Sequence, residues 1–402
     1  MATVHPATAR VVDPELPEVE LLLGSDIPGP LQAVAASLGG EITASQPVQV
    51  TWWPGSSITV RYRAELTGGE IPGSHDLVAV AGRIPEGALV VESDDGDRVG
   101  VWRVPHDPVL PGLPAAMDPV RTAQLLRDLG GQGTAVSTRL RAYRPGRRAV
   151  VSVSGAGEGV FLKLVRPDKI QQLHDEHKRL PEELPVPRSL GLSRELGLMA
   201  MQSMAGLTLR EALENPSLPL PPPEAVTGLV ASLPQPKDRK VRASIIERVP
   251  ALAEVVSAAL PDVDAEVRRF VDRLGSEDVD ELAPVHGDYY EAQILVDGSS
   301  VVGLLDVDTY GLGRPGDDPG VMIGHLALWQ TMSSQAERAG SYLAGLLEVW
   351  DETHDPSDIR RRAAATLLTL ATGPFRVQTA DWPGETRARV ALAHEWLDRA
   401  GR

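Results

Sequence analysis

Cysteine is absent from the 402 residues, and aromatic residues make up only 4% of them. The absence of cysteine excludes disulfide bonds, thiol nucleophiles and cysteine-based zinc sites. Because aromatic side chains are so few, aliphatic residues must fill the hydrophobic cores. No stretch approaches the ~20 apolar residues that a membrane span needs, and the first ten residues lack the apolar core of a secretion signal. We therefore expect a cytoplasmic protein that makes no use of a membrane.

Basic residues are also scarce, with 39 Lys and Arg against 55 Asp and Glu, which gives a net charge of −16. This balance argues against nucleic acid as a partner, because nucleic-acid binding depends on Lys and Arg that neutralise phosphates. It does not exclude ATP, for which one local cationic patch is sufficient. A hydrophobic content of 42% is enough for true cores. The length predicts two or three structural units, and we expect a monomer or a homodimer.

The region between residues 284 and 320 holds two short apolar runs joined by a tight turn. Gln293–Val296 and Val301–Leu305 have the length and composition of buried strands, and Asp297-Gly298 between them is a hairpin signal. Loops at strand ends commonly carry the polar groups of a functional site. The two ends of this predicted hairpin are therefore candidates for a functional site.

Acidic side chains flank the hairpin on both sides. Asp288 precedes the first strand, Asp306 and Asp308 follow the second, and Gln293 begins the first. Converging carboxylates repel one another unless a cation neutralises them. Mg²⁺ suits these hard oxygen ligands, since it typically takes one or two carboxylates together with substrate phosphates, and one Asp then remains free to act as a base. The other acids of the region are interpreted as turn and cap residues: Asp297, Asp317 and Asp318.

The ordered set His286-Gly287-Asp288, Gln293 and Asp306-Val307-Asp308 resembles the catalytic and metal loops of the aminoglycoside phosphotransferase and choline kinase-like family, whose members are relatives of protein kinases. Gln293 stands where this family usually has Asn. In that Gln, and in the second acid Asp308, the chain resembles actinobacterial maltokinase-like and glucosamine kinase-like enzymes most closely. The resemblance implies that Asp288 accepts the proton of an acceptor hydroxyl. It also implies that Gln293 and Asp306 hold Mg²⁺, with Asp308 a candidate ligand for a second ion, and general kinase chemistry assigns the same roles.

Three apolar runs upstream are similar to the small lobe of a kinase. Ser137–Tyr143, Ala149–Ser154 and Val160–Val165 are predicted strands, and Gly155–Gly159 is a predicted turn between the last two. Lys163 lies in the middle of the third strand. A lysine inside an apolar strand either extends its ammonium to solvent or reaches the α- and β-phosphates of ATP. The downstream motif favours the phosphate role.

Lys169–Leu180 is predicted to form the helix that follows this strand. Glu176, thirteen residues after Lys163, is a candidate for the ion-pair partner that positions the lysine, and the alternative is a surface charge. His174 and His177 are three residues apart but have no third ligand nearby. We interpret these two histidines as solvated helix residues.

An apolar strand at residues 196–201, which ends in a short turn with glycine, resembles the nucleotide hinge of this family. The resemblance implies that Met201 lies at the back of the adenine pocket. It also implies that backbone groups of Gln202, Ser203 and Met204 bond the edge of the adenine. The alternative is an ordinary strand and turn whose methionines belong to the core.

Residues 1–118 contain several strand-like runs and predict a small, mostly antiparallel β unit. A cap in front of the kinase lobes is also what the resemblance implies. Trp52, Trp53 and Trp102 would either form the core of this unit or line a sugar-stacking face. The proline-rich stretch Pro105–Pro119 is typical of a linker.

A weak internal sequence similarity links this unit to the small lobe. Trp52-Trp53-Pro54-Gly55 resembles Tyr143-Arg144-Pro145-Gly146, and the first copy offers Arg103 where the second offers Lys163. Duplication of a hairpin unit would explain this internal similarity, and so would two hairpins that are similar without a common origin.

Amphipathic helices are predicted for most of the chain after residue 205. In the family that the chain resembles, the C-terminal helices usually build the acceptor-binding surface. Four residues here are candidates to contact a polyol or an amino sugar, with a purely structural role as the alternative. They are Trp329, Asp381, Trp382 and Glu385.

These observations predict an α+β, two-lobed protein-kinase-like fold, with a β-rich small lobe, a helical large lobe and an extra N-terminal β-rich cap. The predicted domains are residues 1–118, 119–204 and 205–402. The predicted activity is ATP- and Mg²⁺-dependent transfer of the γ-phosphoryl group to a hydroxyl of a small molecule, with a sugar or amino sugar first and an aminoglycoside or another natural product second. Two readings lie outside this class: a non-catalytic nucleotide-binding regulator, and a metal-dependent phosphoesterase, which would need more histidine ligands than the motif supplies.

Overall fold

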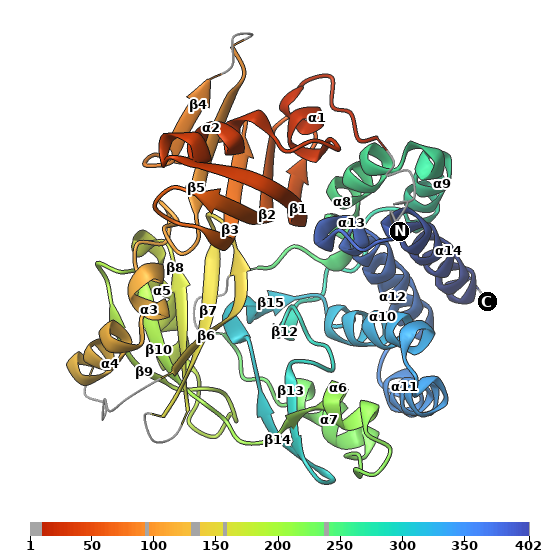
Figure 1. Cartoon of the computed structure of the whole chain (residues 1–402). Coiled ribbons are helices and arrows are strands. Elements are labelled where there is room, and N and C mark those ends of the chain that lie inside the picture. Colours follow the sequence, from red (N-terminus) through yellow and green to blue (C-terminus); the bar gives the residue numbers. More distant parts are fainter. Residues whose placement is uncertain (1–9, 93–95, 130–136, 156–158, 237–240, 402) are drawn as a thin grey trace.

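The computed structural model describes residues 10–92, 96–129, 137–155, 159–236 and 241–401. Two five-stranded sheets form one side of the molecule and a helical lobe forms the other (Figure 1). This is the α+β arrangement that the sequence predicts, with a β-rich small lobe, a helical large lobe and an N-terminal β-rich cap, so the predicted fold class is confirmed. The domain boundaries after residues 118 and 204 and the cytoplasmic location stay predictions. The glycine-rich turn at 155–159 and the first ten residues fall mostly outside the described residues.

The cap is an antiparallel sheet with the strand order β1-β2-β3-β5-β4. Buried and exposed residues alternate along β2, so that one face carries apolar side chains toward two short helices. The helices are α1 (Glu18–Leu23) and α2 (Gly29–Ser37), and the strands are β1 (Gly40–Trp53), β2 (Ser57–Gly68), β3 (Gly73–Ala81), β4 (Leu89–Glu92) and β5 (Arg98–Arg103).

The small lobe repeats this strand order as β6-β7-β8-β10-β9. Its central strand β8 has the predicted bounds Val160–Val165 and carries Lys163, which lies between Val150 of β7 and Met199 of β10. The other elements are α3 (Leu113–Met117), α4 (Pro119–Asp128), β6 (Ser137–Arg144), β7 (Arg148–Ser154), α5 (Pro167–Arg179), β9 (Ser189–Ser193) and β10 (Leu198–Gln202).

One carboxylate fixes the turn between β1 and β2 of the cap. Asp13 Oδ2 accepts a hydrogen bond from Trp52 Nε1 at 3.1 Å and another from the backbone N–H of Gly55 at 2.8 Å. Gly55 has a φ of +65°, a conformation that favours glycine. The carboxylate therefore ties a strand residue and the tip of the turn to the segment that precedes the sheet.

The small lobe holds its first turn by the same arrangement. Asp107 Oδ2 accepts hydrogen bonds from the Tyr143 hydroxyl at 2.7 Å and from the N–H of Gly146 at 2.8 Å, and Gly146 has a φ of +67°. The stretch 105–119 is therefore not a linker, since it contains this anchor and helix α3. The equal strand order of the two sheets and the equal anchoring of their first turns support duplication as the origin of the internal similarity.

The strand order also corrects one detail of the predicted internal similarity. By position in the sheet, β8 with Lys163 corresponds to β3 and not to β5, so the comparison of Lys163 with Arg103 is wrong. Lys163 pairs with Val150, which lies four residues after the turn glycine, and the equivalent residue Thr59 pairs with Val80. Val80 therefore takes the position of Lys163, and the cap copy has no phosphate-binding lysine at this place.

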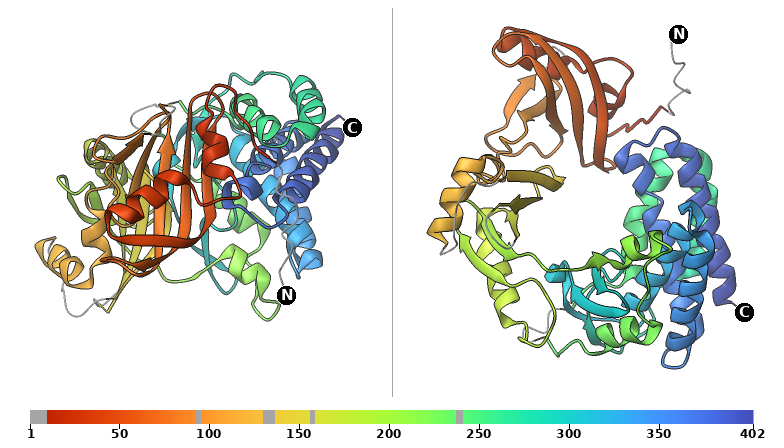
Figure 2. Two further views of the ribbon diagram at one scale, coloured as in Figure 1. Left: turned by 45° about the horizontal axis from the view of Figure 1, so that its top comes forward. Right: turned by 60° about the horizontal axis from the view of Figure 1, so that its bottom comes forward.

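The cap contacts both lobes and lies across the end of the molecule that they share (Figure 2). Trp102 donates to the Tyr143 hydroxyl at 3.1 Å, and the ring centroid of Trp52 lies 6.0 Å from that of Phe375 in the helical lobe. Trp52 and Trp102 are buried, whereas Trp53 is 41% exposed. Two of the three tryptophans therefore serve the core, as one of the two interpretations predicts.

The large lobe joins small antiparallel sheets to a set of packed helices (Figure 1). The described residues contain no helix that is both long and apolar enough to cross a membrane. The strands are β11 (Leu207–Thr208), β12 (Ala283–Val285), β13 (Ile294–Asp297), β14 (Ser300–Leu304) and β15 (Gly311–Gly313). The helices are α6 (Leu209–Glu214), α7 (Pro223–Ala231), α8 (Ile245–Ala259), α9 (Asp264–Leu274), α10 (Asp317–Met332), α11 (Ala336–Asp351), α12 (Pro356–Leu370), α13 (Gly373–Val377) and α14 (Trp382–Ala400), with short 3₁₀ turns at Pro261–Val263 and Val307–Thr309.

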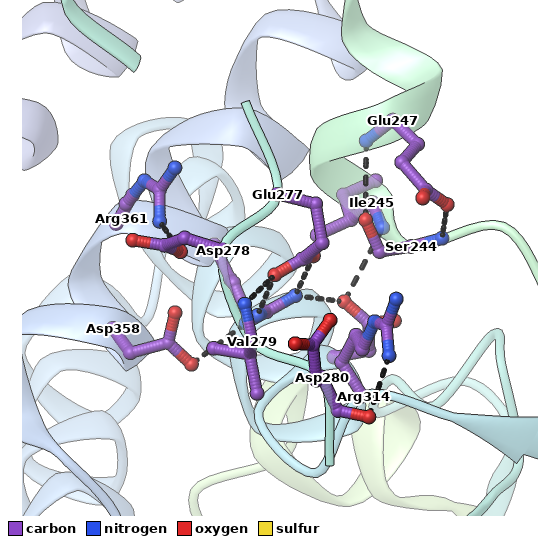
Figure 3. Close-up of polar contacts among 12 residues, drawn as sticks. Ser244, Ile245, Glu247, Glu277, Asp278, Val279, Asp280, Arg314, Asp358 and Arg361 are labelled. Carbon is purple, nitrogen blue, oxygen red and sulfur yellow. Dashed lines mark hydrogen bonds and ion pairs between the residues drawn. The ribbon is translucent and has the colours of Figure 1, made fainter. Parts of the chain in front are cut away.

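A buried arginine organises the helical lobe. The guanidinium of Arg362 in α12 has no exposed surface and pairs with the carboxylates of Glu277 at 2.9 Å, Asp317 at 2.7 Å and Asp358 at 2.8 Å. Glu277 and Asp358 point into this network from two separate segments (Figure 3). Burial alone would raise the pKa of Glu277, but the hydrogen bonds from Arg362, Ser244 and the N–H of Val279, together with the charge of Arg362, outweigh it and lower the pKa to about 2. The network fixes the first turn of α10, where Asp317 lies.

Candidate active site

The ammonium group of Lys163 joins the small lobe to the hairpin of the large lobe. Lys163 Nζ lies 2.8 Å from Asp306 Oδ1 and also pairs with Asp308 Oδ2. Only 7% of the lysine side chain is exposed. Arg148, at the start of β7, adds a second cation, with Nη1 3.7 Å from Asp306 Oδ2. The lysine therefore does not extend to solvent, and the structure brings it to the two predicted metal carboxylates.

Asp306 has an unusual backbone conformation. Its φ of +50° and ψ of +51° lie in the left-handed region, which is uncommon for a residue other than glycine. Such strain persists only where the surrounding structure imposes it, and it is concentrated at functional sites. Asp306 lies just before a short 3₁₀ turn, Val307–Thr309, which contains Asp308.

A histidine of α5 contacts Asp308, and this corrects two predictions. His177 Nε2 lies 3.0 Å from Asp308 Oδ1, and the His177 side chain is 2% exposed. Burial alone would raise the pKa of Asp308, but the hydrogen bond with His177 and the charge of Lys163 outweigh it and hold the pKa well below its usual range. His177 is therefore not a solvated helix residue. His174 is also buried and bonds the Ser189 hydroxyl at 2.7 Å.

Glu176 is not the partner of Lys163. Its Oε1 accepts a hydrogen bond from Gln172 at 2.8 Å, and the residue lines a separate cavity with Pro236 and Tyr310. Successive residues of an α-helix are rotated by ~100°, so α5 can direct either residue 176 or residue 177 toward the lysine. It directs His177, which reaches Lys163 through Asp308.

The catalytic loop is held by a buried carboxylate of α10. Asp318 accepts hydrogen bonds from the N–H of His286 at 2.6 Å and from the N–H of Gly287 at 2.8 Å. Asp288 donates its own N–H to His286 Nδ1 at 3.3 Å, so His286 Nε2 carries the proton and donates to the carbonyl of Leu305 at 2.8 Å. His286 thus orients the loop that presents Asp288 and connects it to the chain just before Asp306.

One cavity of about 430 Å³ lies between the lobes and has the size of a nucleotide site. It is lined by most of the residues that the sequence predicts for nucleotide and metal: Lys163, Met201, Gln202, Ser203, Met204, Gln293 and Asp306. The N–H of Gln202 donates to the Arg188 carbonyl at 2.8 Å and that of Ser203 to the Gly159 carbonyl at 2.9 Å. These two N–H groups are therefore already used within the protein, and only other hinge groups remain for an adenine edge.

The donor set at the hairpin fits Mg²⁺. Asp306 and Asp308 converge on one ammonium group. Gln293 lies beside them, because its backbone carbonyl accepts the Leu305 N–H at 2.7 Å. In the part of the chain that the structure describes, no three His, Cys, Asp or Glu side chains form a metal site by themselves. Two carboxylates and an amide need substrate phosphates to complete the coordination of Mg²⁺.

Aromatic and charged groups surround Tyr290, which follows Asp288 by two residues in the chain. Tyr290 stacks on His325 of α10 with ring centroids 4.2 Å apart, and the Arg210 guanidinium lies 5.9 Å from the Tyr290 centroid. Burial lowers the pKa of His325 to about 4, although the Asp288 charge opposes this shift. His325 is therefore neutral at physiological pH.

The four acceptor candidates of the C-terminal helices are not brought to this site as a group. Trp329 and Trp382 are buried in the core of the helical lobe. Asp381 caps α14 by accepting the Gly384 N–H at 3.1 Å, and Glu385 lies 3.4 Å from Arg389. The structural alternative describes these contacts better than direct binding of a sugar.

Four residues of this region were not predicted as functional candidates: His177, Tyr290, His325 and Asp318. The signal for Asp318 was available, because an acid next to an apolar helix is expensive to bury without a partner. The other three are single residues on helices or loops, and their position at the site depends on packing between distant segments.

Comparison with known proteins shows which family the chain is similar to. A family model described as the phosphotransferase enzyme family matches residues 139–356, more than half of the chain. The solved structure of aminoglycoside phosphotransferase APH(4)-Ia is similar over 70% of this chain and 98% of its own, at 15% identity and a TM-score of 0.45. That of the macrolide 2′-phosphotransferase MphH from Brachybacterium faecium is similar over 69% and 97%, at 17% identity and a TM-score of 0.41. No curated protein matches the chain.

We predict a pH-dependent effect of Asp318→Asn on stability. Burial raises the pKa of Asp318 from 3.8 to about 6. In the pH window between these two values, the folded protein therefore keeps a proton that the unfolded chain releases. The free energy of unfolding of the wild type should therefore fall relative to that of the variant as pH rises through the window, by about 3 kcal/mol in total. Urea unfolding of both proteins across that range measures the difference, and a difference that does not change with pH would contradict the assignment.

We further predict that His177→Leu impairs nucleotide use and that Glu176→Gln does not. Loss of the His177 hydrogen bond leaves Asp308 without one of its two partners, and changes next to metal ligands typically cost about tenfold or more in activity. The adjacent variant Glu176→Gln is the matched control, because it removes a charge from the same turn of α5. Steady-state kcat/KM for ATP separates them, and a larger loss in Glu176→Gln would restore the original pairing.

Proposed function

Because the chain belongs to the phosphotransferase enzyme family, we propose that it transfers the γ-phosphoryl group of ATP to a hydroxyl of a sugar or an amino sugar. The observation that supports this proposal most is the Lys163 ammonium, which pairs with Asp306 and Asp308 beside a cavity of nucleotide size. A lysine on a central strand and carboxylates after a hairpin are the parts that kinases use to hold the phosphates.

In this proposal each predicted residue has one task. Lys163 donates hydrogen bonds to oxygens of the non-transferred phosphates. Met201 borders the adenine, and the hinge residues Gln202, Ser203 and Met204 border its edge. Gln293, Asp306 and Asp308 would hold Mg²⁺. When it is bound, Mg²⁺ neutralises the charge of the β- and γ-phosphates.

The chemical step is carried by Asp288. Its carboxylate orients the acceptor hydroxyl and takes its proton as the hydroxyl oxygen forms a bond to the γ-phosphorus. The bond between that phosphorus and the bridging oxygen breaks, and ADP leaves with the electron pair. The bonds from His286 and Asp318 to the loop keep Asp288 at the position where this transfer needs it.

Asp288→Asn should abolish acceptor-dependent turnover and leave nucleotide binding nearly intact. The amide keeps the shape of the side chain but cannot take the proton, and loss of a general base typically costs at least about 10²-fold in rate. The matched control is Asp297→Asn, which removes an exposed carboxylate from the turn of the same hairpin. A variant at position 288 that keeps more than roughly a tenth of the wild-type rate would contradict the role.

The assay is consumption of ATP with Mg²⁺ against a panel of sugars, amino sugars and aminoglycosides, with identification of the phosphorylated product. Turnover with sugars or amino sugars supports the proposal. Turnover with aminoglycosides alone would indicate that the acceptor is an aminoglycoside and not a sugar or an amino sugar. Tight binding of Mg²⁺-ATP without turnover would favour a non-catalytic regulator.

A further inference from the structure

The cleft-facing side of the small-lobe sheet carries an ordered row of side chains. Met201 of β10 pairs with Phe161 of β8, and two residues further along β8 lies Lys163, which pairs with Val150 of β7. Arg148 lies two residues from Val150 on β7, on the side away from Phe161. Paired residues, and residues two apart on one strand, point to the same face of a sheet, and the interval between the latter is about 7 Å. All five residues line the nucleotide cavity.

This row gives the cavity a direction. In the proposed function Met201 borders the adenine, and Lys163, further along the row, holds the non-transferred phosphates. Arg148 lies beyond Lys163 by one more interval of about 7 Å. Because the order is adenine, non-transferred phosphates and then Arg148, the part of ATP that reaches this arginine is the γ-phosphate.

The guanidinium of Arg148 is close to a metal carboxylate without being bound by it. Its Nη1 lies 3.7 Å from Asp306 Oδ2, which is too long for a hydrogen bond, whereas Lys163 Nζ lies 2.8 Å from Asp306 Oδ1. The Arg148 side chain is one-third exposed. Asp306 therefore leaves the N–H donors of Arg148 free for a ligand, and the planar guanidinium can bind two oxygens of one phosphate at once.

The backbone that carries Arg148 is fixed from outside the hairpin. Asp107 is buried and accepts hydrogen bonds from the Tyr143 hydroxyl at 2.7 Å and from the N–H of Gly146 at 2.8 Å. Arg148 follows Gly146 by two residues and begins β7. A residue on a strand whose turn is anchored in this way holds its position more precisely than a residue on a free loop.

The cap copy of this hairpin has lost two groups together. Its turn is held by an equivalent carboxylate, but Ser57 takes the position of Arg148 and Val80 takes that of Lys163. The fold of the turn therefore does not require the arginine. The paired loss fits two residues that act as a unit on the same ligand.

We propose that Arg148 binds the γ-phosphate of ATP, by which it distinguishes ATP from ADP and stabilises the negative charge on the transferred group. This inference rests on the proposed function and adds a substrate-binding residue to it. Lys163 and Arg148 divide the triphosphate between them, the lysine at the phosphates that stay and the arginine at the phosphate that leaves. In other phosphotransferases an arginine at the transferred group stabilises the transition state in the same way.

Calorimetric titration of the full chain in the presence of Mg²⁺ tests the contact directly, with a non-hydrolysable ATP analogue and ADP as the two probes. Arg148→Gln should weaken binding of the analogue about tenfold or more, the effect of losing a hydrogen bond between charged groups. Its affinity for ADP should stay within about twofold of the wild type, because ADP lacks the γ-phosphate. Arg148→Lys keeps the charge and should bind the analogue more tightly than Arg148→Gln does.

Two matched variants control for loss of positive charge. Arg147→Gln removes a charge from the same turn at an exposed position. Arg141→Gln removes another arginine of the cavity, whose Nε donates to the Ser152 hydroxyl at 2.8 Å on the hinge side of Lys163. Both should keep the wild-type ratio of the two affinities. An unchanged ratio in Arg148→Gln, or an equal loss of affinity for ADP, would overturn the inference.

Turnover separates this inference from the proposed function. With an acceptor, Arg148→Gln should lower kcat by about 10²-fold or more and leave the KM for the acceptor unchanged, since an arginine at the transferred group is worth about 10³-fold or more in kcat. Wild-type turnover together with unchanged nucleotide selectivity and unchanged kcat in Arg148→Gln would overturn this inference alone. A wild type that prefers the ATP analogue through Arg148 but phosphorylates no acceptor would overturn the proposed function alone.

Discussion

The shared pairing of one ammonium group with two carboxylates is the interaction on which the arrangement of the lobes depends. Lys163 comes from the central strand of the small lobe, and Asp306 and Asp308 come from the end of a hairpin in the large lobe. Isolated, these buried charges would be costly, and together they compensate one another. In the proposed function the same three groups, with the strained backbone of Asp306, would supply the cation and the oxygen ligands that a triphosphate requires.

Around this pairing the structure adds supports that come from far away in the chain. Asp318 fixes the catalytic loop, and the Arg362 network in turn fixes the first turn of α10, which carries Asp318. His177 ties α5 to Asp308. Each support is a buried polar contact with its partners in place, and such networks specify one arrangement of rigid elements. The site can therefore hold its geometry although its residues come from both lobes.

Local patterns were sufficient to predict the strand of Lys163, the hairpin and the ordered motif from Asp288 to Asp308, because period and turn chemistry are encoded over a few residues. They were not sufficient to predict which side of α5 faces Lys163, because a rotation by one residue exchanges Glu176 for His177. The repeated anchors Asp13 and Asp107 act over about forty residues, a range that periodicity does not reach, although a comparison of the two DPxLP segments in the sequence would have found them.

The most direct test of the central claim is a calorimetric titration of a non-hydrolysable ATP analogue into the wild-type protein and into Asp306→Asn, each with and without Mg²⁺. If Lys163, Asp306 and Asp308 form the phosphate and metal site, Mg²⁺ will strengthen binding to the wild type markedly, and it will have little effect on the variant. Binding that is equally strong without Mg²⁺, or that Mg²⁺ strengthens equally in both proteins, would contradict the account.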